Sequence, residues 1–314
     1  MRNAFVNTLF EIAKTNPNMI VMTGDLGFGV LTDFWEKLPE QFMNVGISEQ
    51  NMASAAAGMA LEGKDIITYS IGNFPTLRCL EQIRNDICYH NANVKIIAVG
   101  GGFAYGSAGM SHHATEDLAV MRALPNMRVF APADRMEAQA VAKEICQIKS
   151  PCYVRLGKGG EEDVHTSLEE FQIGKAIRLL EGDKACILTT GAIAGEARKA
   201  AAALLQQGVS VGLYTFPTVK PIDRKTITDC AMRYRLIVTI EEHNIIGGFG
   251  GAVAEAIAEL SVRTAVLKRM GLQDVYSSVV GSQDYLRDYY GLSCRKIADF
   301  IQTSIDIVNR GNIH

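Results

Sequence analysis

The sequence lacks the cysteine spacing that a disulfide framework or a zinc site requires. Its seven cysteines are scattered, odd in number and contain no C-x-x-C pair, so we expect reduced thiols. An excess of one charge is also missing, because 31 Lys and Arg residues stand against 34 Asp and Glu residues, giving a formal net charge of -3. This balance argues against bulk electrostatic attraction to nucleic acid or to an anionic membrane.

Long apolar runs are missing as well. The first residues show neither a sustained apolar run nor the cleavage pattern of a secretory signal. The one uncharged stretch, 96–115, is glycine-rich and carries two histidines, which does not suit a membrane-spanning helix. The sequence also contains no P-loop and no short repeat. We therefore expect a cytoplasmic protein with neither a nucleic-acid nor a membrane partner.

The chain does have enough apolar sequence for two cores. It is 314 residues long and 48% hydrophobic, and at about 150 residues per domain this length suggests two domains. Strand-like and helix-like segments alternate in both halves, which predicts two doubly wound α/β domains with parallel sheets. A polar, glycine-containing stretch at 157–170 is the best linker candidate. The expected strands are 19–22, 65–69, 94–99, 127–131, 152–156, 185–190, 209–214 and 236–241, and the expected helices are 5–14, 48–61, 78–89, 116–123, 134–148, 195–207, 251–260 and 295–308.

Three glycine-containing segments follow expected strands, two of them candidate ligand-binding segments and one a candidate turn. Ligands of α/β sheets bind outside the carboxyl ends of the strands, so Gly24-Asp25 and the loop 100–113 should lie at the functional edge. The glycine cluster 247–251 superficially resembles a dinucleotide-binding turn. Its spacing is not G-x-G-x-x-G, and the preceding strand ends in Glu241-Glu242, two carboxylates that would repel a pyrophosphate. We interpret this cluster as a tight strand-to-helix turn.

Several motifs occur in a fixed order along the chain. The motifs of the first half are Gly24-Asp25-Leu26, the segment 44–52, Glu81-Gln82-Ile83-Arg84, the segments 109–118 and 122–126, and Ala131-Pro132-Ala133-Asp134, and those of the second half are the segment 213–223, Glu241-Glu242-His243 and Gly247-Gly248-Phe249-Gly250. In this order the first half resembles the pyrimidine-binding domain of the transketolase family of thiamine diphosphate enzymes, and the second half resembles that family's C-terminal domain. The resemblance covers nearly the whole chain and implies a pyrimidine-binding domain at 1–160, a linker at 161–172 and a C-terminal domain at 173–314.

One part of a complete enzyme of this family has no counterpart here. The family's upstream domain binds the diphosphate through magnesium with a G-D-G motif, whereas Gly24-Asp25-Leu26 departs from that motif and only 24 residues precede Asp25. The resemblance therefore implies the C-terminal, or β, subunit of a split transketolase. A separately encoded N-terminal subunit would hold Mg2+ and the diphosphate of thiamine diphosphate. The implied assembly is a heterotetramer of two such chains and two partners.

The resemblance also implies roles for individual side chains at the cofactor. Glu49, which by itself could simply complement a helix dipole, matches the carboxylate that hydrogen-bonds the aminopyrimidine nitrogen. An acid there favours the imino tautomer, which can take the proton from the thiazolium carbon, and the cofactor is the electron sink. Asp25 matches an aspartate near the thiazolium, and Ile47 is expected beside the cofactor. Phe74, or else Tyr69, would stack on the pyrimidine, although Phe74 could equally be an ordinary core residue.

The substrate end is implied by four further residues. His112 matches a histidine that contacts substrate and is expected to share in catalysis, and His113 is its neighbour on a glycine-rich loop. Arg155 and Lys158 come at the end of the last strand of the first domain. Lys158 takes the position of the family's substrate-phosphate arginine, where an ammonium would act as a point charge; the alternative is an exposed linker lysine.

Two departures bear on the substrate. The family aspartate that reads a sugar hydroxyl aligns with Ala108, and a phosphate-side histidine aligns with Gly100. We therefore expect transfer of a two-carbon ketol unit between sugars, one of them modified, deoxygenated or otherwise unusual. Alternatives are the β subunit of a 2-oxo acid dehydrogenase, a deoxyxylulose phosphate synthase relative, and a non-catalytic scaffold subunit. Retention of Glu49 and Asp25 argues against the scaffold.

Overall fold

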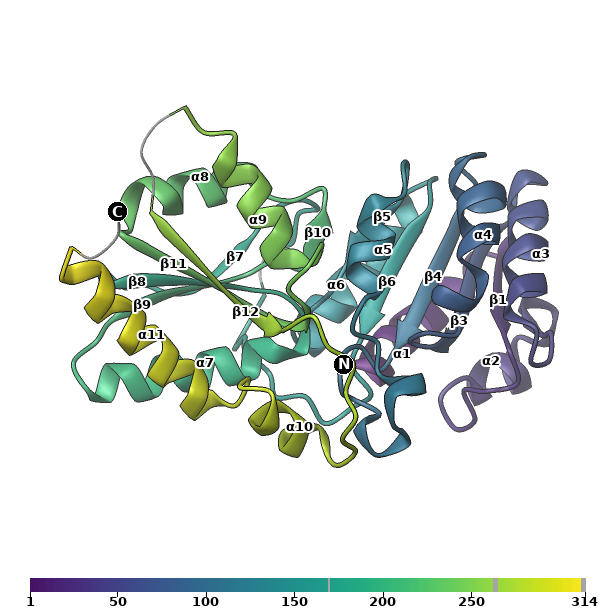
Figure 1. The fold of residues 1–314 in the computed structure, drawn as a ribbon. Coiled ribbons are helices and arrows are strands. Elements are labelled where there is room, and N and C mark those ends of the chain that lie inside the picture. Colours follow the sequence, from purple (N-terminus) through teal and green to yellow (C-terminus); the bar gives the residue numbers. More distant parts are fainter. Residues whose placement is uncertain (169, 262–264, 312–314) are drawn as a thin grey trace.

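The computed structural model describes residues 1–168, 170–261 and 265–311. Two α/β units lie side by side, each with a sheet flanked by helices (Figure 1). The first sheet has the strand order β10-β5-β6-β4-β3-β1-β2 and is parallel except at β10. Its strands are β1 (Met19–Thr23), β2 (Phe42–Asn44), β3 (Asp65–Ile71), β4 (Val94–Val99), β5 (Arg128–Phe130), β6 (Cys152–Leu156) and β10 (Thr218–Lys220).

Helices cover both faces of the first sheet. On one face α1 (Arg2–Ala13), α2 (Thr32–Lys37) and α6 (Arg135–Gln147) bury apolar side chains against the strands. On the other face lie α3 (Glu49–Leu61), α5 (Asp117–Ala123) and the mixed helical segment that contains α4 (Leu80–Gln82). Strands β1, β4 and β6 are buried at every position. Burial on both faces explains why these strands read as near-continuous apolar runs.

The second sheet has the order β12-β11-β8-β9-β7, with β7 antiparallel at its edge. Its strands are β7 (Ile177–Leu180), β8 (Ala185–Thr189), β9 (Val211–Thr215), β11 (Leu236–Asn244) and β12 (Val266–Leu272). Helices α7 (Ala194–Gln206) and α11 (Cys294–Asn309) pack on one face, while α8 (Arg224–Arg233) and α9 (Phe249–Ala258) pack on the other. Helix α10 (Gln283–Tyr289) lies near the junction of the units (Figure 1).

The doubly wound α/β architecture expected from the sequence is confirmed, and each expected strand has an observed counterpart. One expected helix, 78–89, is instead a short α4 between a 3-10 turn at Leu77–Cys79 and a π-helix at Ile83–Cys88. Strand β10 comes from the second half of the chain but extends the first sheet beside β5. Residue 169 of the expected linker lies outside the described residues.

The helices are short or carry charged side chains along their length. Within the described residues, none of them combines the length and apolarity needed to cross a bilayer.

Candidate cofactor and substrate site

Parallel strands bring three chemistry-bearing segments to one edge of the first sheet. Asp25 follows β1, the loop 100–113 follows β4 and Lys158 follows β6. Asp25 is exposed, and its carboxylate accepts a hydrogen bond of 3.0 Å from the Asn44 amide at the end of β2. The Asp25 backbone N–H in turn donates to the Asn44 side-chain oxygen at 2.9 Å. This reciprocal pair fixes the Asp25 carboxylate at the edge where the sequence predicts it.

Glu49 is the first residue of α3, and only 1% of it is exposed. Its Oε2 accepts a hydrogen bond from Arg78 Nη1 at 2.8 Å, within an ion pair whose arginine side chain is 45% exposed. Gly24 approaches the same carboxylate so closely that a Cβ there would lie 3.5 Å from Glu49 Oε1. A buried carboxylate without a counter-ion is costly, and Arg78 compensates the charge of Glu49 here. The sequence pattern alone assigns Arg78 no role.

Phe74 is half-buried and lies between Arg78 and His112. The Arg78 guanidinium carbon stands 4.6 Å from the centre of the Phe74 ring, and the His112 ring meets it edge-on with centroids 5.2 Å apart. Phe74 also lines a cavity of about 460 Å³. Tyr69, the alternative stacking residue, is 4% exposed and packs in the core beneath α1 and α2. The geometry therefore favours Phe74. Other residues lining the cavity include Leu77, Arg78, Met110, His113 and Tyr276.

The adjacent histidines have different surroundings. His112 is partly exposed, with its ring near Phe74 and its centroid 6.2 Å from that of Tyr105. His113 is 2% exposed, and its Nε2 lies 3.0 Å from the Gly106 carbonyl oxygen. Its ring also packs edge-on against Phe103. His112 is thus partly exposed, whereas His113 holds the loop 100–113 through Nε2 and also lines the cavity beside Phe74.

Tyr105 connects His112 to Lys158. The Lys158 ammonium stands 4.8 Å above the Tyr105 ring, a cation–π contact. The same ring covers Gly100, so that a Cβ at Gly100 would overlap it. Tyr105 therefore fills the space into which a side chain at position 100 would project. Together these contacts form a continuous series, here called the site row, made of Glu49, Arg78, Phe74, His112, Tyr105 and Lys158.

Arg155 does not belong to the site row. It is 6% exposed on β6, and its Nε lies 3.0 Å from Asp117 Oδ2. Its Nη2 donates to the carbonyl oxygens of Ala114 at 2.7 Å and Glu242 at 2.9 Å. All of these contacts are internal, so Arg155 supports the loop 100–113 and strand β11 instead of facing the row.

The second unit also supports this loop. Glu242 on β11 accepts a hydrogen bond from the Phe103 backbone N–H at 2.6 Å. The same carboxylate is held by Gln283 at 2.9 Å and by the buried Arg287 at 2.7 Å, both on α10. A carboxylate of the C-terminal half therefore fixes the backbone of a loop that carries His112.

The glycine cluster 247–251 is the expected strand-to-helix turn. Glu241 Oε2 accepts a hydrogen bond from the Phe249 N–H at 2.6 Å, and Oε1 accepts one from the Gly250 N–H at 2.8 Å. Burial raises the pKa of Glu241 to about 7. Because this carboxylate already occupies the N-terminus of α9, the turn offers no place for a pyrophosphate.

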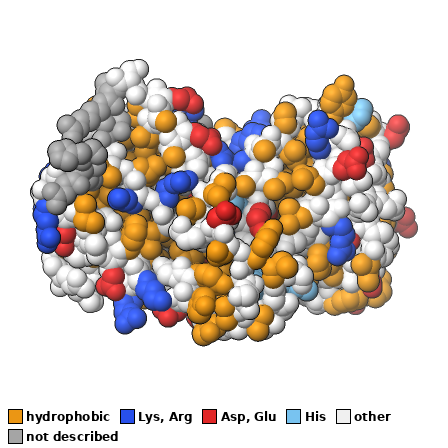
Figure 2. Space-filling model, viewed as in Figure 1, with side chains coloured by type: hydrophobic (Ala, Val, Ile, Leu, Met, Phe, Trp, Pro, Cys, Tyr) orange, Lys and Arg blue, Asp and Glu red, His pale blue; other side chains and the backbone are white. Residues whose placement is uncertain are grey.

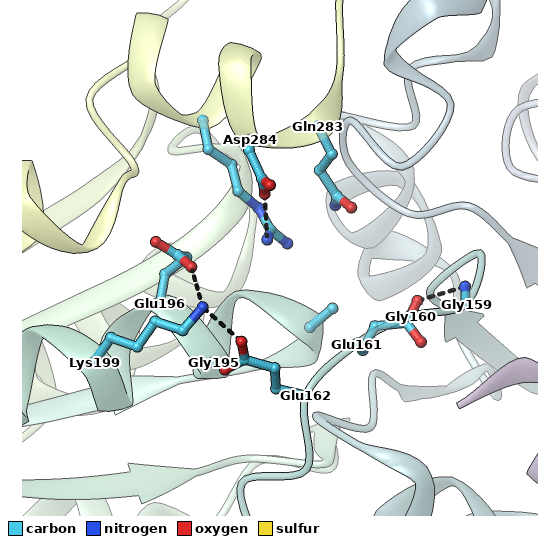
Figure 3. A pocket seen from close by; sticks show the side chains of 11 residues that line it. Gly159, Gly160, Glu161, Glu162, Gly195, Glu196, Lys199, Gln283 and Asp284 are labelled. Atoms are coloured by element: carbon cyan, nitrogen blue, oxygen red, sulfur yellow. Dashed lines mark hydrogen bonds and ion pairs between the residues drawn. The ribbon is translucent and has the colours of Figure 1, made fainter.

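A separate polar cavity of about 260 Å³ lies where the linker meets α7 and α10 (Figure 3). Lys199 spans it with ion pairs to Glu162 at 2.9 Å and Glu196 at 3.2 Å. Residues of the site row do not line this cavity. The ion pair of Lys199 with Glu162 joins α7 to the linker, whereas its pair with Glu196 lies within α7.

The two units correspond to two known domain families. The family model for the transketolase pyrimidine binding domain matches residues 1–160, and that for the transketolase C-terminal domain matches residues 174–297. The chain belongs to the transketolase family of thiamine diphosphate enzymes.

Two relatives and one solved structure match this chain over nearly their whole length. A putative transketolase C-terminal section of Methanocaldococcus jannaschii is 40% identical over 95% of this chain and 94% of the relative. One of the subunits of an apulose-4-phosphate transketolase of Phocaeicola vulgatus is 33% identical over 96% of this chain and 97% of the relative. A solved structure described as a split gene transketolase, inactive beta4 tetramer, superposes with a TM-score of 0.87 and 36% identity, covering 97% of both chains. The chain is therefore built like the β subunit of a split transketolase.

Proposed function

We propose that this chain is the C-terminal subunit of a split transketolase that transfers a two-carbon ketol unit between sugars, in the first instance sugar phosphates. The observation that carries the proposal is the Glu49 carboxylate, buried at the head of α3 and connected through Arg78 to the partly exposed ring of Phe74. Phe74 and Arg78 line the cavity of about 460 Å³, and the Glu49 carboxylate is hydrogen-bonded to Arg78. A carboxylate and an aromatic ring match the chemistry of an aminopyrimidine, which offers ring nitrogens and an aromatic face.

These residues fit the pyrimidine half of thiamine diphosphate. When bound, the cofactor supplies the electron sink for carbon–carbon bond cleavage. Glu49 would hold a proton between its carboxylate and the ring nitrogen, Phe74 would stack on the ring, and Asp25 would face the thiazolium side. Ile47, two residues before Glu49 and 76% exposed, would cover the ring from the loop that precedes α3.

The substrate would lie along the other half of the site row. His112 would donate or accept a proton at a sugar oxygen, and Lys158 would attract an anionic end group. Arg155 would act indirectly, because its side chain is committed to internal contacts. His113 lines the cavity and would remain beside the substrate while its Nε2 holds the Gly106 carbonyl. Ala108 and Gly100 stand where the family has an aspartate and a histidine that contact the substrate. The loss of these two polar side chains supports a substrate sugar other than the standard pentose phosphates.

The diphosphate and Mg2+ would be held by an N-terminal partner subunit. Within the described residues there is no group of three or more His, Cys, Asp or Glu side chains placed to hold a metal ion. Large apolar side chains are exposed near the functional edge, as expected of an interface, and Figure 2 shows apolar side chains spread across one face over both units. They include Phe28, Trp35, Ile47, Met110 and Tyr276.

The assembly we propose is a heterotetramer of two such chains and two partners, in the cytoplasm. The similar solved structure is described as an inactive tetramer of β chains, which supports a subunit that needs its partner for activity. Relatives described as a transketolase section or subunit match this chain over nearly their full length, which favours a split enzyme.

Calorimetry of thiamine diphosphate with magnesium tests this proposal. The chain alone and its mixture with the neighbouring N-terminal subunit are titrated, and tight binding is expected only in the mixture. Glu49→Gln in the mixture is expected to lower turnover by at least about 10²-fold, because it removes the proton-sharing acid. Normal turnover of that variant would contradict the role of Glu49, and no cofactor binding in either sample would favour a scaffold subunit.

Product analysis separates the enzymatic alternatives. A transketolase exchanges a two-carbon unit between two sugars, so both products are sugars. Formation of 1-deoxy-D-xylulose 5-phosphate by the mixture would instead identify a synthase of that type. Efficient turnover of xylulose 5-phosphate with ribose 5-phosphate would contradict the unusual sugar.

A further inference from the structure

Arg78 contacts both groups that would bind the aminopyrimidine in the proposed function, the Glu49 carboxylate and the Phe74 ring. Its Nη1 donates to Glu49 Oε2 at 2.8 Å, and its guanidinium lies 4.6 Å from the centre of the Phe74 ring. One cation therefore fills the hydrogen-bond position of the carboxylate and covers a face of the aromatic ring.

We propose that Arg78 is a positioning residue that holds Glu49 and Phe74 in place until the cofactor arrives and is then displaced by it. This proposal rests on the proposed function, because it needs the aminopyrimidine to bind at Glu49. In the unloaded site, Arg78 compensates a carboxylate that is only 1% exposed, which would otherwise be an unpaired buried charge. The ion pair thus stabilises the unloaded site and lowers its apparent affinity for the cofactor.

The location of Arg78 allows such a displacement. Its side chain is 45% exposed, so it forms the outer layer over Glu49 and can move into solvent without opening the core. It lies in the 3-10 turn Leu77–Cys79, directly before α4 and the π-helix. Irregular helical segments of this kind are frequent at functional sites. The cavity that Arg78 helps to line provides the space for the incoming ring.

Two variants and one control test the displacement in the assembled complex. Arg78→Met removes the charge and keeps an unbranched side chain, Arg78→Lys keeps the charge without the planar fork, and Arg84→Met changes an exposed arginine of the same segment that contacts Asn85. Calorimetry with thiamine diphosphate and magnesium gives the dissociation constant of each complex. Thermal unfolding of each chain gives its stability, and size-exclusion chromatography verifies complex formation.

Arg78→Met is expected to bind the cofactor about tenfold more tightly, equivalent to about 1.4 kcal/mol, while its own melting temperature falls. Arg78→Lys should give a smaller change in the same direction, and Arg84→Met should resemble the wild type. Structural damage would not tighten binding, so the opposite signs of the two effects identify displacement.

Equal or weaker binding by Arg78→Met in an intact complex would overturn the displacement and leave the proposed function standing. In that case Arg78 would stay in place and contact the cofactor or substrate directly. Failure of the wild type and of every variant to bind the cofactor would overturn both proposals together.

Discussion

His112 and His113 are adjacent in the same loop, but their side chains have different surroundings. The ring of His112 lies between those of Phe74 and Tyr105, where it remains partly exposed. His113 turns inward, packs on Phe103 and uses its Nε2 at the Gly106 carbonyl. The first is therefore partly exposed, and the second stabilises the loop that carries both histidines.

Substituting each histidine separately tests this division. His112→Asn is expected to lower kcat/KM of the complex about 10- to 100-fold with little change in melting temperature, because it would remove the proposed proton-transfer group from a partly exposed position. His113→Asn is expected to lower the melting temperature, because it leaves a buried ring position partly empty. Steady-state kinetics and thermal unfolding of both variants measure the two effects. A large stability loss in His112→Asn would contradict the separation.

At the same scale, some site residues could be predicted from the sequence and others could not. Glu49 and His112 belong to short motifs with recognisable order, so their positions were predictable. The contact of Arg78 with Glu49, 29 positions earlier in the chain, could not be predicted, because it depends on how the chain packs. Arg155 was expected at the substrate because it ends a strand, but its side chain points into an interior that holds Asp117. The sequence predicts that Arg155 lies on a strand, but the direction in which its side chain points depends on how the strand packs.

At the scale of secondary-structure elements, the loop after β4 depends on the packing of the Tyr105 ring against Gly100. Gly100 has a φ of 90°, a left-handed conformation that favours glycine. The Tyr105 ring covers its Cα, so the loop has room for one large side chain here. Strands such as β4 could be predicted because they are mostly apolar, with Lys95 as the one charged residue of β4. The three-residue strands β2 and β10 lack such a run.

Gly100→Ala tests this packing. The methyl group would be strained by the positive φ and would displace the Tyr105 ring, so the free energy of unfolding should fall by about 1–3 kcal/mol. Gly58→Ala is the matched control, because Gly58 lies inside α3 with no atom within 4 Å of an added Cβ and alanine favours helix there. Denaturant unfolding measures both. Equal stability of Gly100→Ala and wild type would contradict the packing of Tyr105 on Gly100.

At the scale of the whole molecule, the two units are joined by shared structure. Strand β10 leaves the second half of the chain to extend the first sheet, and one apolar core runs through both units, including the contact of Phe216 with Phe249. A buried polar cluster also crosses the junction. Glu137 of α6 accepts a hydrogen bond of 2.6 Å from Thr215 of β9, and His165 lies 2.9 Å from Asp134, the N-cap of α6.

This cluster makes the stability of the whole chain depend on pH. Burial raises the pKa of Glu137 from 4.5 to about 7, so between these values the folded chain keeps a proton that the unfolded chain has released. The contribution of Glu137 to stability therefore falls as pH rises from about 4.5 to 7. Hydrogen bonding to Asp134 raises the pKa of His165 against its burial, which acts in the same direction. Glu137→Gln should flatten this dependence, whereas Glu144→Gln on the same helix should leave it unchanged. Denaturant unfolding of the three chains at several pH values measures the slopes, and equal slopes for wild type and Glu137→Gln would show that another group carries the dependence.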